Sequence, residues 1–141
     1  RFVRLAPVSA TVRKRRLTAI TGPSGSGKST LLRCCNRLIV PTSGSIEFLG
    51  TDLSEIEPLA LRRRVGMLFQ RPTTFAGSVA DNLRVAEPAA TDARIVELLE
   101  RARLSPDYAD RVADSLSGGE AQRMCLARAL ATRPEVLLMD E

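Results

Sequence analysis

The chain has 141 residues, of which 44% are hydrophobic and 26% are charged, and this composition is typical of one folded domain with its own core. No apolar run approaches the roughly 20 residues that a membrane-spanning helix requires. The net charge of +5 is concentrated in the amino-terminal half, and a solvated surface explains it more simply than nucleic-acid binding. The cysteines Cys34, Cys35 and Cys125 show no framework spacing, which indicates core residues in a reducing compartment.

The first expected elements surround a glycine-rich segment. Residues 17–21, LTAIT, are a short apolar run with β propensity, and GPSGSGKST follows at 22–30. The pattern from Ser29 to Ile39 predicts a helix, which Pro41 and Gly44 end. A strand before such a segment and a helix after it are the context of a phosphate-binding loop.

Residues 45–50 predict a strand with a glycine turn, and residues 59–64 predict one or two helical turns. A buried strand is expected at residues 65–69, ending at Gln70. Helices are expected after Ser78, over Asp92–Ala102, and from near Ser117 to the break at Pro134. A last buried strand is expected at residues 136–139, VLLM. This order predicts an α/β fold with a mainly parallel sheet. Its core would comprise residues 1–70 and 134–141, with residues 71–133 as a helical insertion.

The segment from Gly22 to Ser29 fits the pattern G-x-x-x-x-G-K-[ST]. Glycines allow a tight turn around an anion, and the following helix adds its positive amino-terminal dipole. Lys28 can reach the β- and γ-phosphates, and the Ser29 hydroxyl suits Mg²⁺. The competing interpretation is a glycine-rich turn with a solvated lysine. The residues expected to bind nucleotide are Gly22, Pro23, Ser24, Gly25, Ser26, Gly27, Lys28, Ser29 and Thr30.

Two carboxylates follow the last predicted strand, Asp140 and Glu141. In P-loop NTPases an acid at this place holds Mg²⁺, and Asp140 is the candidate. Its neighbour Glu141 could then take a proton from the attacking water as a general base. An apolar run followed by two acids is weak evidence alone and becomes strong beside a phosphate loop.

The signature segment, residues 116–120 with the sequence LSGGE, precedes an amphipathic pattern. Alone, it would be a helix N-cap with a flexible lead. Together with residues 22–30, Gln70 and VLLMDE at 136–141, however, the sequence LSGGEAQR at 116–123 resembles the ATP-binding subunits of ABC transporters. The order and spacing agree over residues 17–141, and Glu120 stands where glutamine is more usual.

The resemblance implies a P-loop NTPase fold of the ABC type, an ATPase activity, and ATP with Mg²⁺ as ligands. It implies catalytic roles for Glu141, Gln70 and Lys28, and metal contacts from Ser29, Gln70 and Asp140. It also implies a head-to-tail homodimer, or a pair with another ABC ATPase, that forms on ATP binding. There the signature residues would contact the partner's ATP, and they are Leu116, Ser117, Gly118, Gly119 and Glu120.

A membrane permease is the second implied partner, which would hold the protein peripherally at the cytoplasmic face of the membrane. Residues 71–84 occupy the place that contacts the permease, with Phe75 and Val79 as candidate contacts. The segment FQRPTTFAGSVADNL looks similar to subunits of the phosphate-import and metal-export kinds. No nucleic-acid partner is expected, and the arginines at 62–64 are interpreted as a solvated helix face.

Two alternatives stay open at this point, a non-transport ABC ATPase that acts on DNA or ribosomes and an inactive fragment. Members of the family continue past the glutamate that matches Glu141 and carry a histidine, whereas this chain has none. We therefore expect an incomplete domain that is unstable or inactive alone. Phe2 is the candidate for stacking on adenine.

Overall fold

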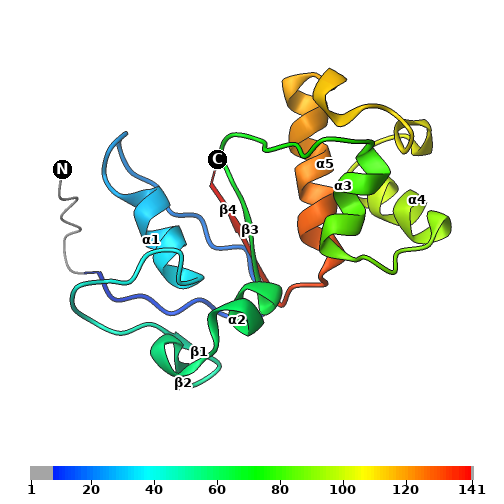
Figure 1. Cartoon of the computed structure of the whole chain (residues 1–141). Coiled ribbons are helices and arrows are strands. Elements are labelled where there is room, and N and C mark those ends of the chain that lie inside the picture. The colour runs from blue at the N-terminus through cyan, green and yellow to red at the C-terminus, as the bar shows by residue number, and fades with distance from the viewer. Residues whose placement is uncertain (1–7, 141) are drawn as a thin grey trace.

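The computed structural model describes residues 8–140, so Phe2 and Glu141 lie outside the described residues. Figure 1 shows the parallel strands β3 and β4 in the middle of the molecule. On one side lie α1, α2 and the β1–β2 hairpin, and on the other α3, α4 and α5. The elements are α1 (Lys28–Cys35), β1 (Glu47–Phe48), β2 (Thr51–Asp52), α2 (Pro58–Arg64), β3 (Val65–Leu68), α3 (Val79–Ala86), α4 (Asp92–Arg101), α5 (Gly118–Ala131) and β4 (Val136–Met139), with short 3₁₀ turns at Leu53–Glu55, Pro106–Tyr108 and Ala113–Ser115.

The parallel pair is aligned from Val65 opposite Val136 to Leu68 opposite Met139. The chain between these strands contains α3, α4 and α5. A parallel pair needs a long crossover connection, and these helices provide it. The backbone N–H of Asp140 donates to the Leu68 carbonyl at 3.0 Å, which extends the pairing one residue past β4.

The predicted strand at residues 17–21 is wrong, because the structure has no strand there. These residues are exposed, and the Leu17 side chain is 87% accessible. Apolar residues with β propensity form a strand only when a neighbour accepts and donates their backbone hydrogen bonds. Within residues 8–140 the parallel ladder contains β3 and β4 only.

The strand with a glycine turn expected at residues 45–50 is present as β1 and the turn after it, and the turn leads into a second strand, β2, that was not predicted. Phe48 pairs with Thr51, and the turn between them consists of Leu49 and Gly50. Both turn residues have positive φ, 53° and 82°, which is the backbone that a two-residue hairpin favours. Leucine is unusual there, and the glycine is the residue that suits the turn.

The helix that follows the glycine-rich segment ends at Cys35, four residues before the predicted end at Ile39. Its last turn closes at once, since the Arg33 carbonyl accepts from the N–H groups of Leu38 and Ile39. The side chain of Asn36 also accepts from the Leu38 N–H at 3.3 Å. Asparagine competes for backbone hydrogen bonds in this way, which makes it a helix terminator.

The three later helices are confirmed, and each begins at a side-chain N-cap. Ser78, Thr91 and Ser117 accept a hydrogen bond from the third residue of α3, α4 and α5. The helices bury a common apolar cluster to which Leu68 of β3 also belongs. The cluster consists of Leu68, Val79, Ala80, Leu83, Ala90, Ile95, Leu98, Leu99, Ala102, Leu104, Ala113, Met124, Cys125, Ala127 and Ala131.

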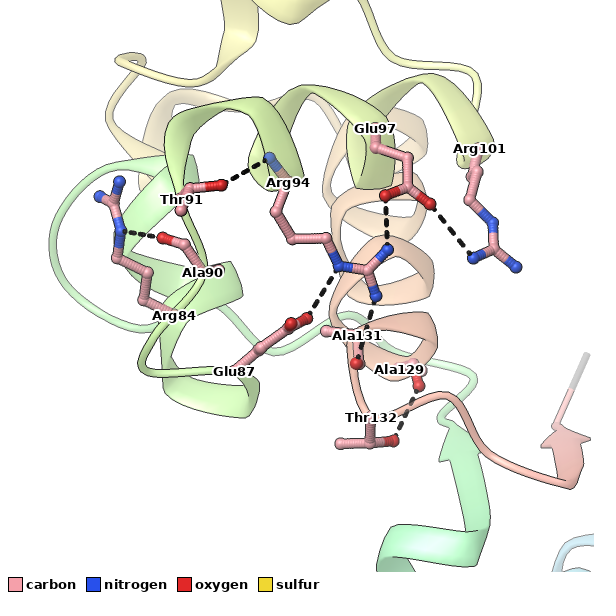
Figure 2. Close-up of polar contacts among 10 residues, drawn as sticks. All are labelled: Arg84, Glu87, Ala90, Thr91, Arg94, Glu97, Arg101, Ala129, Ala131 and Thr132. Atoms are coloured by element: carbon pink, nitrogen blue, oxygen red, sulfur yellow. Dashed lines mark hydrogen bonds and ion pairs between the residues drawn. The ribbon is translucent and has the colours of Figure 1, made fainter.

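A charged network joins α4 to the carboxyl end of α5, as Figure 2 shows. The Arg94 side chain is only 10% exposed and forms ion pairs with Glu87 at 3.0 Å and Glu97 at 2.8 Å. A second guanidinium nitrogen donates to the Ala131 carbonyl at 3.5 Å, at the end of α5. Arg94 lowers the pKa of Glu97, chiefly through the hydrogen bond between these two side chains. The network therefore neutralises a nearly buried charge and satisfies a helix end.

A second, smaller cluster consists of Leu53, Leu61 and Val65. The strand β4 is only half-buried, and Met139 is 50% exposed, so the prediction of a buried last strand is wrong in this respect. A parallel strand becomes buried on both faces only when layers cover both of them. Among the described residues β4 has a single neighbouring strand, β3.

Two of the three arginines of α2 form specific contacts, whereas the sequence predicted a solvated helix face for all three. The Arg62 guanidinium donates to the Asn36 carbonyl at 3.2 Å and to the Arg37 carbonyl at 2.7 Å, beside the end of α1. Arg64 lies 4.6 Å from the Phe48 ring centroid and pairs with Glu135 at 2.6 Å. These two arginines therefore connect the hairpin, the end of α1 and Glu135, the residue before β4, although Arg64, like Arg63, is exposed.

Candidate functional site

The glycine-rich segment forms an exposed loop that leads directly into α1. Gly25 has a φ of 79° and Gly27, the N-cap of α1, has a φ of 96°. Both angles lie in the region that side chains with a Cβ rarely adopt. Glycine is thus required at these two places for the loop to turn into the helix.

Lys28, the first residue of α1, folds back over this loop. Its Nζ donates to the carbonyls of Gly22 at 2.9 Å and Pro23 at 3.0 Å. The ammonium group and the start of α1 therefore lie at one place, and both favour an anion.

Ser29 and Asp140 are brought together although 111 residues separate them in the chain. The Ser29 hydroxyl donates to Asp140 Oδ1 at 2.6 Å, and Asp140 is buried with 6% exposure. The carboxylate reaches this place because Asp140 directly follows β4 and remains bonded to Leu68. A hydroxyl and a buried carboxylate are oxygen donors of the kind that Mg²⁺ prefers.

Gln70 lies on the exposed loop that follows β3. It lines an open cavity of about 430 Å³ together with Arg33 of α1, Phe69, Arg71 and Thr73. The loop after β3 therefore faces α1 across this cavity.

The signature segment surrounds the amino terminus of α5. Ser117 Oγ accepts from the Glu120 N–H at 3.4 Å, and Glu120 Oε2 accepts from the Ser117 N–H at 2.8 Å. This reciprocal capping box leaves Gly118 and Gly119 exposed, and a Cβ at Gly118 would meet nothing within 4 Å. Leu116 is half-buried and packs against the helical cluster.

Glu120 has a partner that sequence analysis missed. The Tyr108 hydroxyl donates to Glu120 Oε1 at 2.6 Å, and Arg111 lies 4.0 Å from the Tyr108 ring centroid. The hydrogen bond from Tyr108 and those from Ser117 lower the pKa of Glu120 to about 2. In return, Glu120 raises the pKa of Tyr108. The carboxylate is thus charged and directed toward its own helix start and Tyr108.

The two conspicuous glycine motifs lie apart within one molecule. Figure 1 shows the start of α5 on the side of α3 and α4, whereas the glycine-rich loop and α1 lie beyond the β3–β4 pair. The structure brings Lys28, Ser29 and Asp140 together, and it leaves Ser117–Gly119 on a separate exposed surface.

Two further residues were also missed, Asn82 and Arg128. Asn82 is completely buried in α3 and Arg128 is half-buried in α5. Both bond to the loop that follows Gln70. The sequence did contain a signal for Asn82, because this polar residue stands beside the apolar Leu83 in a predicted helix. A polar side chain that is buried in such a helix needs hydrogen-bond partners.

Three negative observations apply to residues 8–140. The described helices include none that is long and apolar enough to cross a membrane. No group of three or more histidine, cysteine or acidic side chains could hold a metal among the described residues. The cysteines are free, and burial raises the pKa of Cys34 and Cys35, as expected for residues that pack in the core.

Comparison with known proteins gives a consistent result. A family model described as ABC transporter matches residues 5–141. Protein STAR1 of Oryza sativa subsp. japonica is 51% identical over 129 residues, covering 89% of this chain and 37% of that protein. The phosphate import ATP-binding protein PstB 2 of a Synechococcus strain is 44% identical over 149 residues, covering 95% of this chain and 56% of that protein.

Among solved structures, cbiO1 of Clostridium perfringens, described as part of the ABC transporter complex cbiONQ, matches with a TM-score of 0.83 and 28% identity. The match covers 97% of this chain and 58% of that chain. The chain thus spans between about a third and three fifths of the lengths of these proteins.

Proposed function

The chain belongs to the ABC transporter family and has the P-loop NTPase fold of its ATP-binding domains, and from this premise we propose that it forms most of one ATP site. The observation that carries the proposal is the 2.6 Å hydrogen bond between Ser29 and Asp140. It joins the phosphate-binding loop to the acid that follows β4, as ATP hydrolysis in this fold requires. We also propose residues 1–70 with 134–141 as the nucleotide-binding core and 71–133 as a helical subdomain.

Each site residue receives a role in this proposal. The backbone of 22–27 and the start of α1 would hold the phosphates, while Lys28 would move from its loop carbonyls to the γ-phosphate. Ser29 and Asp140 would hold Mg²⁺, with Gln70 nearby, and the metal would supply charge neutralisation on the phosphates. Glu141 would accept the proton of the attacking water.

The exposed start of α5 supports a second copy of the chain as partner. Ser117, Gly118 and Gly119 offer a hydroxyl, amides and a helix N-terminus that no γ-phosphate bound in the same chain would reach. A head-to-tail dimer would place them on the partner's ATP and would make dimerisation depend on ATP.

The transport role is inferred from relatives. The family match and the names of the relatives favour an ATPase that drives a membrane permease, held at the cytoplasmic face through that partner. Residues 71–84 are the proposed contact, with Phe75 exposed on the loop. Val79, the first residue of α3, is completely buried, so it would support this surface from within and would not itself touch the permease. The relatives named for phosphate import make that anion the first substrate to test.

Complementation between two inactive variants tests the shared site. Lys28→Ala removes the phosphate-loop cation, and Ser117→Arg blocks the signature surface. Each variant of the complete gene product should lose ATPase activity. Mixing them should restore roughly a quarter of wild-type activity, because about half of the dimers are mixed and each mixed dimer has one intact site of two.

The chain's other lysine, Lys14, provides a matched control, and Lys14→Ala should leave the rate unchanged. An equimolar mixture that stays as inactive as its components would contradict a site built from two chains. A Lys28→Ala protein with wild-type turnover would contradict the ATPase itself.

A further inference from the structure

The loop at residues 73–75, between Gln70 and α3, contains no helix or strand, yet its backbone is held firmly by side chains. Two helices supply them, α3 through Asn82 and α5 through Arg128. None of these contacts belongs to the phosphate site described above.

Asn82 binds one residue of the loop through both of its amide atoms. Its Nδ2 donates to the Phe75 carbonyl at 2.8 Å, and its Oδ1 accepts from the Phe75 N–H at 2.8 Å. The same Nδ2 also donates to the Ser78 carbonyl at 3.0 Å. Because Asn82 is completely buried, these bonds have little competition from water.

Arg128 binds the loop from the opposite helix. Its Nη2 donates to the Thr73 carbonyl at 2.7 Å, and its Nη1 donates to Asn82 Oδ1 at 3.3 Å. The guanidinium carbon lies 4.6 Å from the Phe75 ring centroid. A lysine has neither the planar fork nor the stacking surface for these three contacts together.

The loop has two more attachments to α5. Cys125 Sγ also donates to the Thr73 carbonyl, at 3.5 Å, and the other attachment lies nearer to β3. Gln122 Nε2 donates to the Phe69 carbonyl at 3.1 Å. Gln70 therefore lies between two points that α5 holds, the Phe69 carbonyl and the Thr73 carbonyl. The same helix begins at Ser117.

We propose that Arg128, together with Asn82, is a positioning residue that fixes the loop around Gln70 to α5. It makes the loop and the signature segment move as one body. The proposal rests on the proposed function, from which Gln70 and Ser117 take their roles. A force applied to Phe75 by a permease would then reach the Gln70 of its own site and the partner's γ-phosphate through a single helix.

Arg128→Lys in the complete gene product tests this proposal, with two measurements made well below the melting temperature. Exchange of the Phe75 amide, which donates to Asn82 Oδ1, should rise at least about tenfold, while α3 and α4 keep their protection. The kcat for ATP should fall about tenfold or more with KM unchanged, since misplaced positioning groups affect the rate rather than ATP binding.

Two further variants make the result specific. Phe75→Leu removes only the stacking partner of Arg128 and should give a smaller change of the same kind. Arg101→Lys alters an arginine of α4 whose side chain is 50% exposed, and it should change neither measurement.

The proposal is overturned if Arg128→Lys keeps wild-type loop exchange, or if kcat falls only in proportion to lost folded protein. A purely stabilising arginine would give that second result. Should the wild-type protein prove unable to hydrolyse ATP, the proposed function fails, and the exchange measurement still decides whether Arg128 holds the loop.

Discussion

The region of α3, α4 and α5 and the region around the glycine-rich loop are built in different ways. The first shares in a cluster of fifteen buried apolar residues, and each of its helices begins at a capping side chain. The second has a cluster of three, Leu53, Leu61 and Val65. It is held largely by single polar contacts such as Ser29–Asp140 and the Arg62 bonds at the end of α1.

The difference shows that the candidate phosphate site need not lie where the apolar side chains are most densely packed. The candidate phosphate site lies in the sparsely packed region, where a ligand can add contacts that the protein lacks. The signature segment sits on the densely packed region, which holds its exposed glycines on a fixed helix start.

The largest expected effect on stability comes from truncating a buried leucine to alanine in each of the two apolar clusters. Leu98 and Leu61 are each 0% exposed, one in each cluster. Leu98→Ala should cost about 3–5 kcal/mol of unfolding free energy, because the dense cluster cannot collapse into the space. Leu61→Ala should cost about 2–3 kcal/mol, since few residues surround it.

Urea unfolding at constant temperature measures both values, and Leu59→Ala is the exposed control in α2, expected within about 0.5 kcal/mol of wild type. If Leu98→Ala and Leu61→Ala lowered the unfolding free energy equally, or in the reverse order, the claimed difference in packing between the two regions would be contradicted.

Sequence reasoning succeeded where local signals decide the structure. The capping serines Ser78 and Ser117 and the spacing of Ile95, Leu98 and Leu99 placed three helices, because one amphipathic face with a cap is sufficient. The strand expected at 17–21 failed for the opposite reason, since a strand depends on a neighbour that local sequence does not reveal.

The candidate site divides in the same way. The motif rules predicted that Lys28, Ser29 and Asp140 share one site, and the structure brings these three residues together. The motif fixes the spacing of Lys28 and Ser29, and Asp140 was expected there because it ends a buried strand. The motif rules did not reveal Asn82, Arg128 or Tyr108, whose partners are backbone groups or side chains distant in the chain. Such pairings follow from tertiary packing and have no fixed spacing.

An intermediate effect is expected from removing the polar contact that closes the phosphate site. Ser29→Ala leaves the buried Asp140 carboxylate without its hydroxyl donor, at a cost of about 1–3 kcal/mol in stability. The Mg²⁺ concentration that gives half-maximal ATPase activity should also rise about tenfold. Ser29→Thr keeps a hydroxyl and should retain both properties.

Thermal unfolding and Mg²⁺ titration of the rate measure these two changes. If Ser29→Ala matched wild type in both measurements, the Ser29–Asp140 contact would not stabilise the region around the glycine-rich loop. The claim that single polar contacts hold this region together would then be contradicted.

The smallest expected effect is local to the start of α5 and depends on pH. The folded-state pKa of Glu120 is about 2, below its ordinary value of 4.5. The charged carboxylate therefore contributes stability that is complete above about pH 4.5 and is lost as the pH falls toward 2. Glu120→Gln removes this contribution, so its stability should change less than that of wild type across that range.

Tyr108→Phe sharpens this test, because the Tyr108 hydrogen bond is the largest cause of the lowered pKa. Carboxyl NMR titration should show the pKa of Glu120 moving up toward its ordinary value in this variant. A pKa that stays near 2 would assign the shift to the Ser117 capping box alone.

The contact between Ser29 and Asp140 has a consequence for the order of assembly during synthesis. The hydroxyl leaves the ribosome 111 residues ahead of the carboxylate that it binds, and the whole of α3, α4 and α5 is translated in between. Helices with short-range contacts form quickly, whereas a contact between distant residues closes slowly. The phosphate loop therefore stays without its acid on the nascent chain until Asp140 is made, whereas α3, α4 and α5 are complete before that point and can already pack together.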